Sequence, residues 1–135
     1  MVEIRAARIE DHDAVMKLWE DGGIALASDE QWRSITSDGC ARLLIAEEAG
    51  VPVGAAIAAY DGWRAYAYHI AVTREHRRRG VATALLSEVE RNVKQRGAER
   101  IFVLVHESKT DGLALCTTAG YEVEGDLALV KSLFG

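Results

Sequence analysis

The segment His76-Arg77-Arg78-Arg79-Gly80-Val81-Ala82-Thr83 (HRRRGVAT) places three arginines and a glycine directly before an apolar stripe. The stripe has helical spacing and consists of Ala82, Leu85, Leu86, Val89 and Val93. It predicts a helix of about four turns that ends at Gly97. Because Tyr66 to Val72 reads as a strand, the region predicts a strand, a basic loop and a long amphipathic helix.

The start of this helix is a candidate anion site. The first turn of a helix carries backbone N–H groups without internal partners and the positive end of the helix dipole. Gly80 and Ala82 let a bulky diphosphate approach that backbone, and neighbouring arginines add charge-assisted donors. Three arginines alone usually form a solvated surface, but the strand before them and the helix after them favour an anion site.

The composition predicts one soluble globular domain over residues 1–135, because 49% of residues are hydrophobic and 27% are charged. The 21 acidic and 16 basic residues give a formal net charge of −5. This balance argues against duplex nucleic acid as the main partner. The basic run therefore predicts a local anion site within an acidic protein.

No segment approaches the roughly 20 apolar residues that cross a bilayer, and the N-terminus lacks the apolar core of a signal peptide. We therefore expect a cytoplasmic protein that does not bind membranes. Cys40 and Cys116 are the only cysteines. They exclude a disulfide framework and a four-cysteine zinc site, and we expect no metal.

The remaining pattern predicts a compact α+β domain with a mostly antiparallel sheet. Including the strand before the basic loop, strands are predicted at 1–9, 42–48, 53–60, 64–72 and 101–105, with two more beginning at Tyr121 and Leu127. Further helices are predicted after the acidic residues 10–13, at 29–35 with Ser28 as its cap, and at 111–119. Asp61-Gly62 predicts a hairpin with a type I′ turn.

The segment from Val72 to Ala82 resembles the acyl-CoA signature of the GNAT superfamily of N-acetyltransferases, Arg/Gln-x-x-Gly-x-Gly/Ala. Arg77, Gly80 and Ala82 carry the match, and Arg74 replaces a family proline. The segment 115–121 is similar to the family pattern Leu-Tyr-x-x-x-Gly-Phe/Tyr. The resemblance covers nearly the whole chain, and the segment 60–64 is similar to small bacterial members of the ribosomal-protein acetyltransferase-like group.

This resemblance implies the GNAT fold, in which a mixed, mostly antiparallel sheet of about six or seven strands with splayed central strands is flanked by about four helices. It implies acetyl-CoA as co-substrate and direct transfer to an amine in a ternary complex. The family's diphosphate site corresponds here to Arg77, Arg78, Arg79, Gly80, Val81, Ala82 and Thr83. The family's pantetheine site corresponds to the strand residues Ile70, Ala71 and Val72.

The usual catalytic side chains of the family are missing. Cys116 stands where many members carry a tyrosine that protonates the thiolate, and Leu104 stands where some carry a glutamate. The segment 108–111 replaces an asparagine that often precedes the fourth helix. Cys116 is either a weak proton donor or a small side chain packed in a helix, because free cysteine is often buried.

Other catalytic candidates lie on the central strand. Alternation places Tyr66, Tyr68 and Ile70 on one face and His69 on the other. Tyr68 is a candidate to contact the substrate or to orient a water molecule. His69 is a candidate for the general base. For each residue, the alternative is that its side chain makes only a structural hydrogen bond. His106 and Glu107 are candidates to receive a proton through water.

The acceptor class follows from a difference in pKa. Deprotonating a lysine side chain at pH 7 costs about 4.6 kcal/mol, whereas an α-amino group costs about 1 kcal/mol. Without a strong dedicated base, the site favours a small amine or a peptide α-amine over lysine. The alternatives are a catalytically weak acyl-CoA-binding or sensing module and a structural domain that binds no CoA. Trp63 at the hairpin indicates either a homodimer contact or local packing.

Overall fold

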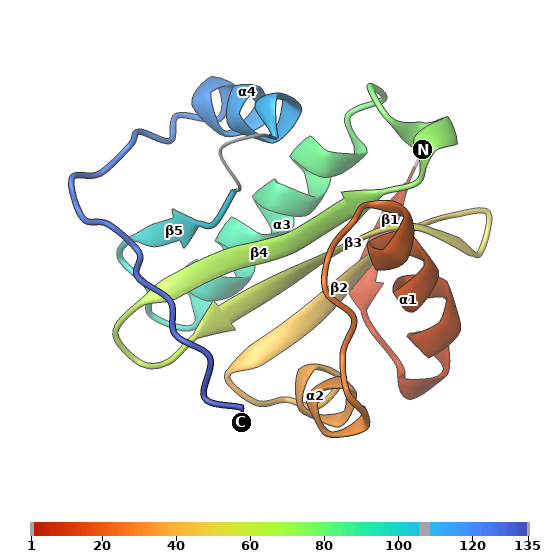
Figure 1. Ribbon diagram of the computed structural model, residues 1–135. Helices are drawn as coiled ribbons and strands as arrows, with labels where there is room; N and C mark the ends of the chain where they lie inside the picture. Colours follow the sequence, from red (N-terminus) through yellow and green to blue (C-terminus); the bar gives the residue numbers. More distant parts are fainter. Residues whose placement is uncertain (1, 106–108, 135) are drawn as a thin grey trace.

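The computed structural model describes residues 2–105 and 109–134. Its five-stranded sheet has the order β1-β2-β3-β4-β5 (Figure 1). The strands are β1 (Glu3–Ala6), β2 (Ala41–Glu48), β3 (Val51–Tyr60), β4 (Ala65–Val72) and β5 (Ile101–Val103). Neighbouring strands pair antiparallel except for β4 and β5, which are parallel. The predicted mostly antiparallel sheet is confirmed.

Helices flank both faces of this sheet. They are α1 (His12–Asp21), α2 (Asp29–Ile35), α3 (Val81–Gln95) and α4 (Thr110–Thr118), with short 3-10 turns η1 (Ile9–Asp11) and η2 (Arg74–His76). Figure 1 shows α1 and α2 on one face and α3 on the other. Among the helices that the structure describes, none combines the length and apolar composition needed to cross a bilayer.

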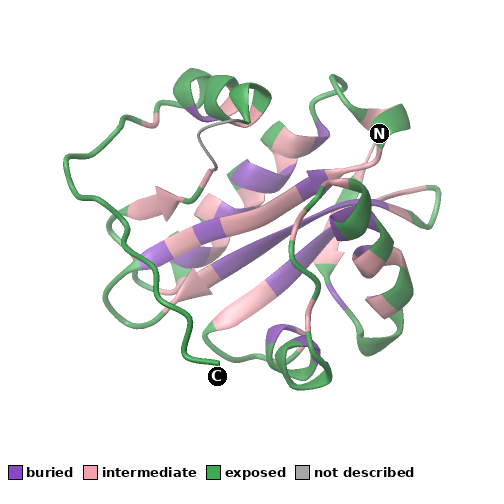
Figure 2. Cartoon of the chain, viewed as in Figure 1, coloured by how far each residue is buried: buried purple, intermediate pink, exposed green. Residues whose placement is uncertain are grey.

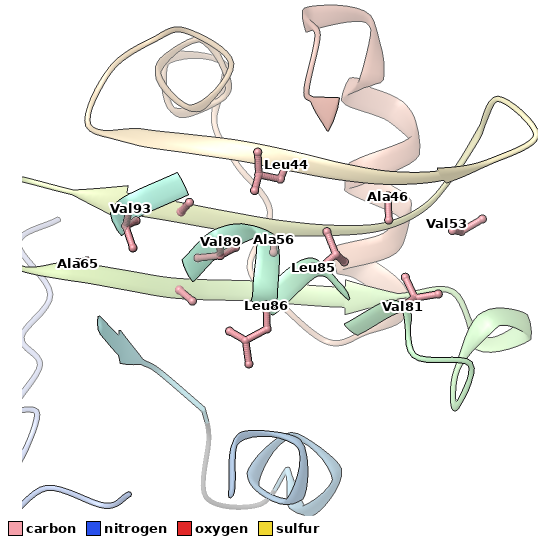
Figure 3. Close-up of a cluster of buried hydrophobic side chains, with 12 residues drawn as sticks. Leu44, Ala46, Val53, Ala56, Ala65, Val81, Leu85, Leu86, Val89 and Val93 are labelled. Atoms are coloured by element: carbon pink, nitrogen blue, oxygen red, sulfur yellow. The ribbon is translucent and has the colours of Figure 1, made fainter. Parts of the chain in front are cut away.

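Each face of the sheet has its own hydrophobic core. Against α3, the buried side chains of the strands and the helix include Leu44, Ala46, Val53, Ala56, Leu85, Leu86, Val89 and Val93 (Figure 3). Against α1 and α2 they include Val15, Leu18, Trp19, Trp32, Leu43, Ile45 and Ile57. Figure 2 shows the buried residues concentrated along the central strands. The two cores fix β3 and β4 between the helix layers.

The structure confirms the predicted second helix with its cap. Ser28 Oγ accepts from the Gln31 amide at 3.2 Å, and Gln31 Oε1 accepts from the Ser28 amide at 2.8 Å. This reciprocal pair satisfies two donors at the helix start. The helix covers residues 29–35, as its capping pattern predicts.

The hairpin prediction at Asp61-Gly62 is wrong in its turn type. Tyr60 pairs with Ala65, which leaves a four-residue loop between β3 and β4. Asp61 Oδ1 accepts from the amides of Trp63 and Arg64, both at 2.8 Å. These bonds hold a wider loop in which only Gly62 has a positive φ.

The two strands predicted from Tyr121 and Leu127 do not form, and β5 ends at Val103 rather than residue 105. The described part of the sheet therefore has five strands instead of six or seven. Next to this segment, β5 offers an edge of only three residues. Side-chain contacts hold the following segment instead, because Tyr121 Oη donates to Glu90 Oε2 at 2.6 Å and Arg100 Nη2 donates to Glu124 Oε1 at 2.8 Å. Figure 2 shows the described chain exposed from residue 122 onward.

Candidate active site

The pairing between β4 and β5 ends halfway along β4. Their last paired residues are Ala67 and Val103, and the Leu104 amide donates to the Ala67 carbonyl at 3.2 Å. Beyond this point β4 continues to Val72, with no strand of the described chain on that side (Figure 1). The edge from Tyr68 to Val72 is therefore open to an extended ligand that can use backbone hydrogen bonds.

A β-bulge occurs where this open edge begins. Tyr68 pairs with Ile57 and Ala71 pairs with Ala55, so His69 and Ile70 share the space opposite one residue of β3. His69 has a φ of 53°, in the left-handed region that non-glycine residues rarely occupy. Trp19 Nε1 donates to the His69 carbonyl oxygen at 3.2 Å, which holds the bulge against α1.

The bulge shifts the alternation of side chains along β4. Tyr68 packs with the α1–α2 core, whereas Ile70 and Val72 pack with the α3 core. The rings of Tyr68 and His69 lie edge to face with centroids 5.7 Å apart. The prediction that Tyr68 shares a face with Ile70, opposite His69, is therefore wrong, because simple alternation contains no signal for an extra residue.

The hydrogen bonds of His69 define which ring nitrogen can accept a proton. Nε2 lies 3.1 Å from the Ala25 carbonyl oxygen. Since a carbonyl can only accept, Nε2 carries the hydrogen and the neutral ring keeps a lone pair on Nδ1. Trp19 packs edge to face on the ring at 4.9 Å. The geometry leaves Nδ1 as a basic atom on a fixed imidazole.

Tyr68 and Cys116 differ in what they can offer this site. Burial raises the pKa of the Tyr68 hydroxyl, which therefore stays protonated and can donate a hydrogen bond at neutral pH. Burial also raises the pKa of the Cys116 thiol, which makes it a weaker acid. Cys116 lies buried on α4 and makes no hydrogen bond to Tyr68 or His69 within the described chain. The structure brings together two of the three predicted catalytic residues.

At the other end of the open edge, the loop into α3 presents unpaired amides. The Arg77 amide donates to the Arg74 carbonyl, and the next backbone bond is from the Ala84 amide to the Gly80 carbonyl. Between them, the amides of residues 78–83 donate to no acceptor in the described chain. Gly80 caps the helix with a φ of 80°. Of the predicted diphosphate-binding amides, those from Arg78 to Thr83 are available and that of Arg77 is used internally.

The surroundings of these amides are open and basic. A Cβ placed on Gly80 would meet no protein atom within 4 Å. Arg78 and Arg79 are exposed, and neither forms an ion pair with a described residue. Arg77 is also exposed, and its Nε donates to the Val72 carbonyl oxygen at 3.2 Å. A ligand with several anionic oxygens fits this combination of donors and positive charge.

Some contacts around the site were beyond sequence reasoning. His76 lies with its Nδ1 2.8 Å from Thr73 Oγ1 and its Nε2 2.6 Å from Glu48 Oε2. Lys109 Nζ donates to the Gly22 carbonyl oxygen at 3.2 Å, between α4 and the loop after α1. Glu48 lies 28 residues from His76, and Gly22 lies 87 residues from Lys109, so no local pattern indicates these two contacts. The candidates His106 and Glu107 lie outside the described residues.

The described residues contain no group of three or more histidine, cysteine, aspartate or glutamate side chains placed to share a metal ion.

The sequence profile of the acetyltransferase (GNAT) family matches residues 4–121. A ribosomal-protein-alanine N-acetyltransferase from Brucella melitensis biovar Abortus 2308 is 20% identical, covers 98% of this chain and 100% of its own, and has a TM-score of 0.79. The aminoglycoside N-acetyltransferase AAC(6')-Iy, solved with a CoA-containing bisubstrate analogue, is 18% identical, covers 98% of each chain and has a TM-score of 0.82. A transcriptional regulator from Bacillus halodurans C-125 is 18% identical, covers 98% of this chain and 100% of its own, and also has a TM-score of 0.82. At these identities the solved structures show the shared fold.

The parted β4–β5 pair, the bulged strand and the open amides before α3 together form one candidate site along β4. The chain belongs to the acetyltransferase (GNAT) family. Its activity is therefore acetyl-CoA-dependent N-acetylation in the broad sense that the family defines.

Proposed function

We propose that this protein transfers an acetyl group from acetyl-CoA directly to a primary amine, and that the acceptor is a small amine or a peptide α-amine rather than lysine. One observation carries the proposal. A single strand, β4, has the basic turn at one end of its unpaired edge and the Tyr68–His69 pair at the other. One extended co-substrate could therefore bind the basic turn with its anionic end and place its sulfur end beside the Tyr68–His69 pair.

The residues of this chain fit acetyl-CoA as follows. The amides of residues 78–83 and the guanidinium groups of residues 77–79 would hold the diphosphate. Backbone groups near Ile70, Ala71 and Val72 would bond the pantetheine amides along the open edge of β4. The thioester would then lie near the bulge at His69.

The chemistry follows from the two side chains at the bulge. His69 Nδ1 would take a proton from the acceptor ammonium, directly or through water, so that the neutral amine attacks the thioester carbon. A C–N bond forms and the C–S bond breaks in this step. The attacking nitrogen then loses its second proton, which passes through water to the departing sulfur, so that CoA leaves as a thiol. The protonated Tyr68 hydroxyl would hydrogen-bond that water or the sulfur.

The acceptor preference rests on the strength of the available base. A single imidazole suits an α-amino group, whose deprotonation at pH 7 costs about 1 kcal/mol, better than a lysine at about 4.6 kcal/mol. The test uses paired peptides that contain one lysine and have either a free or a blocked N-terminus. We expect CoA release and an N-terminal acetyl group, located by mass spectrometry, only with the free peptide. Equal or faster acetylation of the lysine in the blocked peptide would contradict the preference.

A second candidate is an acyl-CoA-binding or sensing module with weak turnover. It is favoured by Cys116, which stands where relatives carry a tyrosine and whose thiol pKa is raised by burial. Calorimetry with acetyl-CoA, followed by CoA release with a panel of amines, separates the two candidates. The panel includes small diamines, peptides and aminoglycosides, since the fold is shared with aminoglycoside acetyltransferases. Binding without release across the panel would favour the module.

We also infer that the protein acts in the cytoplasm without nucleic acid or metal, in keeping with its acidic charge and two cysteines. Trp63 is 87% exposed, so the alternative of local packing is wrong. A homodimer contact through Trp63 stays a prediction. Sedimentation of the protein and of a Trp63→Ser variant tests it.

A further inference from the structure

We propose that His76 is a positioning residue for acetyl-CoA, because its side chain fixes the loop that presents the diphosphate-binding amides. The inference rests on the proposed function, which assigns the diphosphate to the amides of residues 78–83. His76 lies in the turn η2, directly before the three arginines. Its ring makes contacts on both sides, to Thr73 Oγ1 and to Glu48 Oε2.

These contacts fasten the loop to two strands. The Thr73 amide donates to the Val53 carbonyl oxygen in β3 at 2.8 Å. The His76 ring reaches farther, because Glu48 is the last residue of β2. The ring is mostly shielded, with 22% of its side chain exposed. Beyond its backbone bonds, the turn is thus anchored to β2 by one imidazole.

The loop needs such an anchor for two reasons. A 3-10 turn of three residues has weak hydrogen-bond geometry and little stability of its own. In addition, four arginines lie within residues 74–79, and their like charges repel one another when no anion is bound. Nε2 bound to the Glu48 carboxylate opposes the spreading of this basic segment.

An ordered loop strengthens binding because less of the binding free energy is then lost in ordering the loop around the ligand. Arg78 has a φ of 63°, and Gly80 has a φ of 80°. Both conformations shape the backbone that presents the amides of residues 78–83. The His76 anchor holds the residues immediately before this strained segment. Its loss therefore weakens acetyl-CoA binding without changing the groups that carry out the transfer.

The experiment compares His76→Ala and His76→Gln with the unmodified protein. The glutamine amide can replace Nε2 as the donor to Glu48, whereas alanine removes both ring contacts. We expect His76→Ala to raise the acetyl-CoA Kd by calorimetry, and its KM, by about five- to tenfold. His76→Gln should recover part of this loss. The kcat at saturating acetyl-CoA and the KM for the amine should stay unchanged in both variants.

The matched control is His12→Ala, which removes another histidine that contacts a carboxylate, Asp13 Oδ1 at 3.0 Å, at the start of α1. A second measurement adds Glu48→Gln to His76→Ala, and no further loss in affinity is expected because the contact is already gone.

Equal acetyl-CoA affinity in the wild-type protein and His76→Ala would overturn the inference, as would a loss confined to kcat. If His76→Ala does not fold, His76→Gln and Thr73→Val, checked by thermal unfolding, decide in the same way. Absence of acetyl-CoA binding by the wild-type protein would instead overturn the proposed site, and the inference with it.

Discussion

At the scale of single residues, His69 shows how one backbone conformation places a side chain for chemistry. A positive φ in the middle of a strand is costly for a histidine, and the Trp19 and Ala25 contacts hold it there. The result is a fixed ring beside Tyr68, and its Nδ1 has no hydrogen-bond partner among the described residues. The sequence identified both residues as candidates from their types. It could not place them together, because the bulge depends on contacts with α1 and the loop after it.

The role of His69 as a base can be separated from its structural bond. In His69→Gln the side-chain amide can still donate to the Ala25 carbonyl, but no basic nitrogen remains. We expect kcat to fall by about a hundredfold at pH 7, while the acetyl-CoA Kd is unchanged. Steady-state kinetics with calorimetry measures both values. An unchanged kcat in His69→Gln, together with a loss in His69→Ala, would assign only the structural bond to His69.

Asp11 carries a different prediction, because it is the one buried charged residue of the described chain. The hydrogen bonds from Arg5, at 2.8 and 3.0 Å, hold the pKa of this carboxyl below its usual value, and the Arg8 amide adds a bond at 2.7 Å. A lowered folded-state pKa gives stability that is complete above the unfolded value of about 3.9 and is lost as the pH falls through the folded value. We expect Asp11→Asn to lower the free energy of unfolding at pH 7 by about 2 kcal/mol.

The pH dependence provides the check on that expectation. Denaturant unfolding of both proteins should show a difference that shrinks as the pH falls below about 4. The control is Asp13→Asn, since the Asp13 side chain is fully exposed and should contribute little. A difference that is constant from pH 7 to pH 3 would show that charge on Asp11 is not its source.

At the scale of elements, the start of α3 combines features that the sequence shows well. The arginines, Gly80 and the apolar stripe lie within one segment, so the basic loop and the helix were predictable from local spacing. Leu85, Leu86, Val89 and Val93 are buried and confirm most of the predicted inward face. In the first turn the buried residue is Val81 rather than the predicted Ala82, which is only half-buried. What local spacing did not show is the anchoring of this loop by Glu48, which belongs to another strand.

The glycine at this helix start provides a test of the anion site. Gly80→Ala places a Cβ where no protein atom lies within 4 Å, so its steric effect should fall on a bound ligand. The positive φ adds backbone strain of about 1 kcal/mol. We expect acetyl-CoA affinity to fall at least about tenfold, measured by calorimetry, because the methyl group blocks close approach to the amides.

The matched control for this variant is Gly62→Ala in the β3–β4 loop. Gly62 also has a positive φ, 97°, and also has no protein atom within 4 Å of a built Cβ. An alanine at position 62 would have similar backbone strain, but at the opposite end of β4 from the candidate anion site. Equal losses of acetyl-CoA affinity in the two variants would show that strain, rather than blocked approach, explains the result at Gly80.

At the scale of the whole molecule, the sheet is stabilised by cores on both faces, and α3 covers one of them. Leu85 on α3 is fully buried, and Gly54 of β3 lies beneath it so closely that an added Cβ would be 3.0 Å from a Leu85 methyl. This close contact holds the helix against the strand beside the open edge of β4. The stability of the domain and the placement of the diphosphate turn therefore depend on the same packing.

Truncating Leu85 measures this dependence. We expect Leu85→Ala to lower the free energy of unfolding by about 3 kcal/mol, through lost burial and the cavity that remains. Leu127→Ala is the control, because Leu127 is 86% exposed and should change stability by less than about 0.5 kcal/mol. Denaturant unfolding gives both values. A cost at Leu127 comparable to that at Leu85 would show that the segment after α4 is packed in solution.

The sequence by itself determined the helices, five of the strands and the basic turn before α3, and it indicated a mostly antiparallel sheet. These features depend on residues within a few positions of one another, where periodicity, capping and glycine conformation act directly. Only the tertiary structure decided that the His69 and Tyr68 side chains lie on the same face of β4 and that His76 contacts Glu48. It also decided that residues 121–134 add no strand to the five-stranded sheet. Those outcomes depend on contacts between distant segments, and a linear pattern does not encode which of them form.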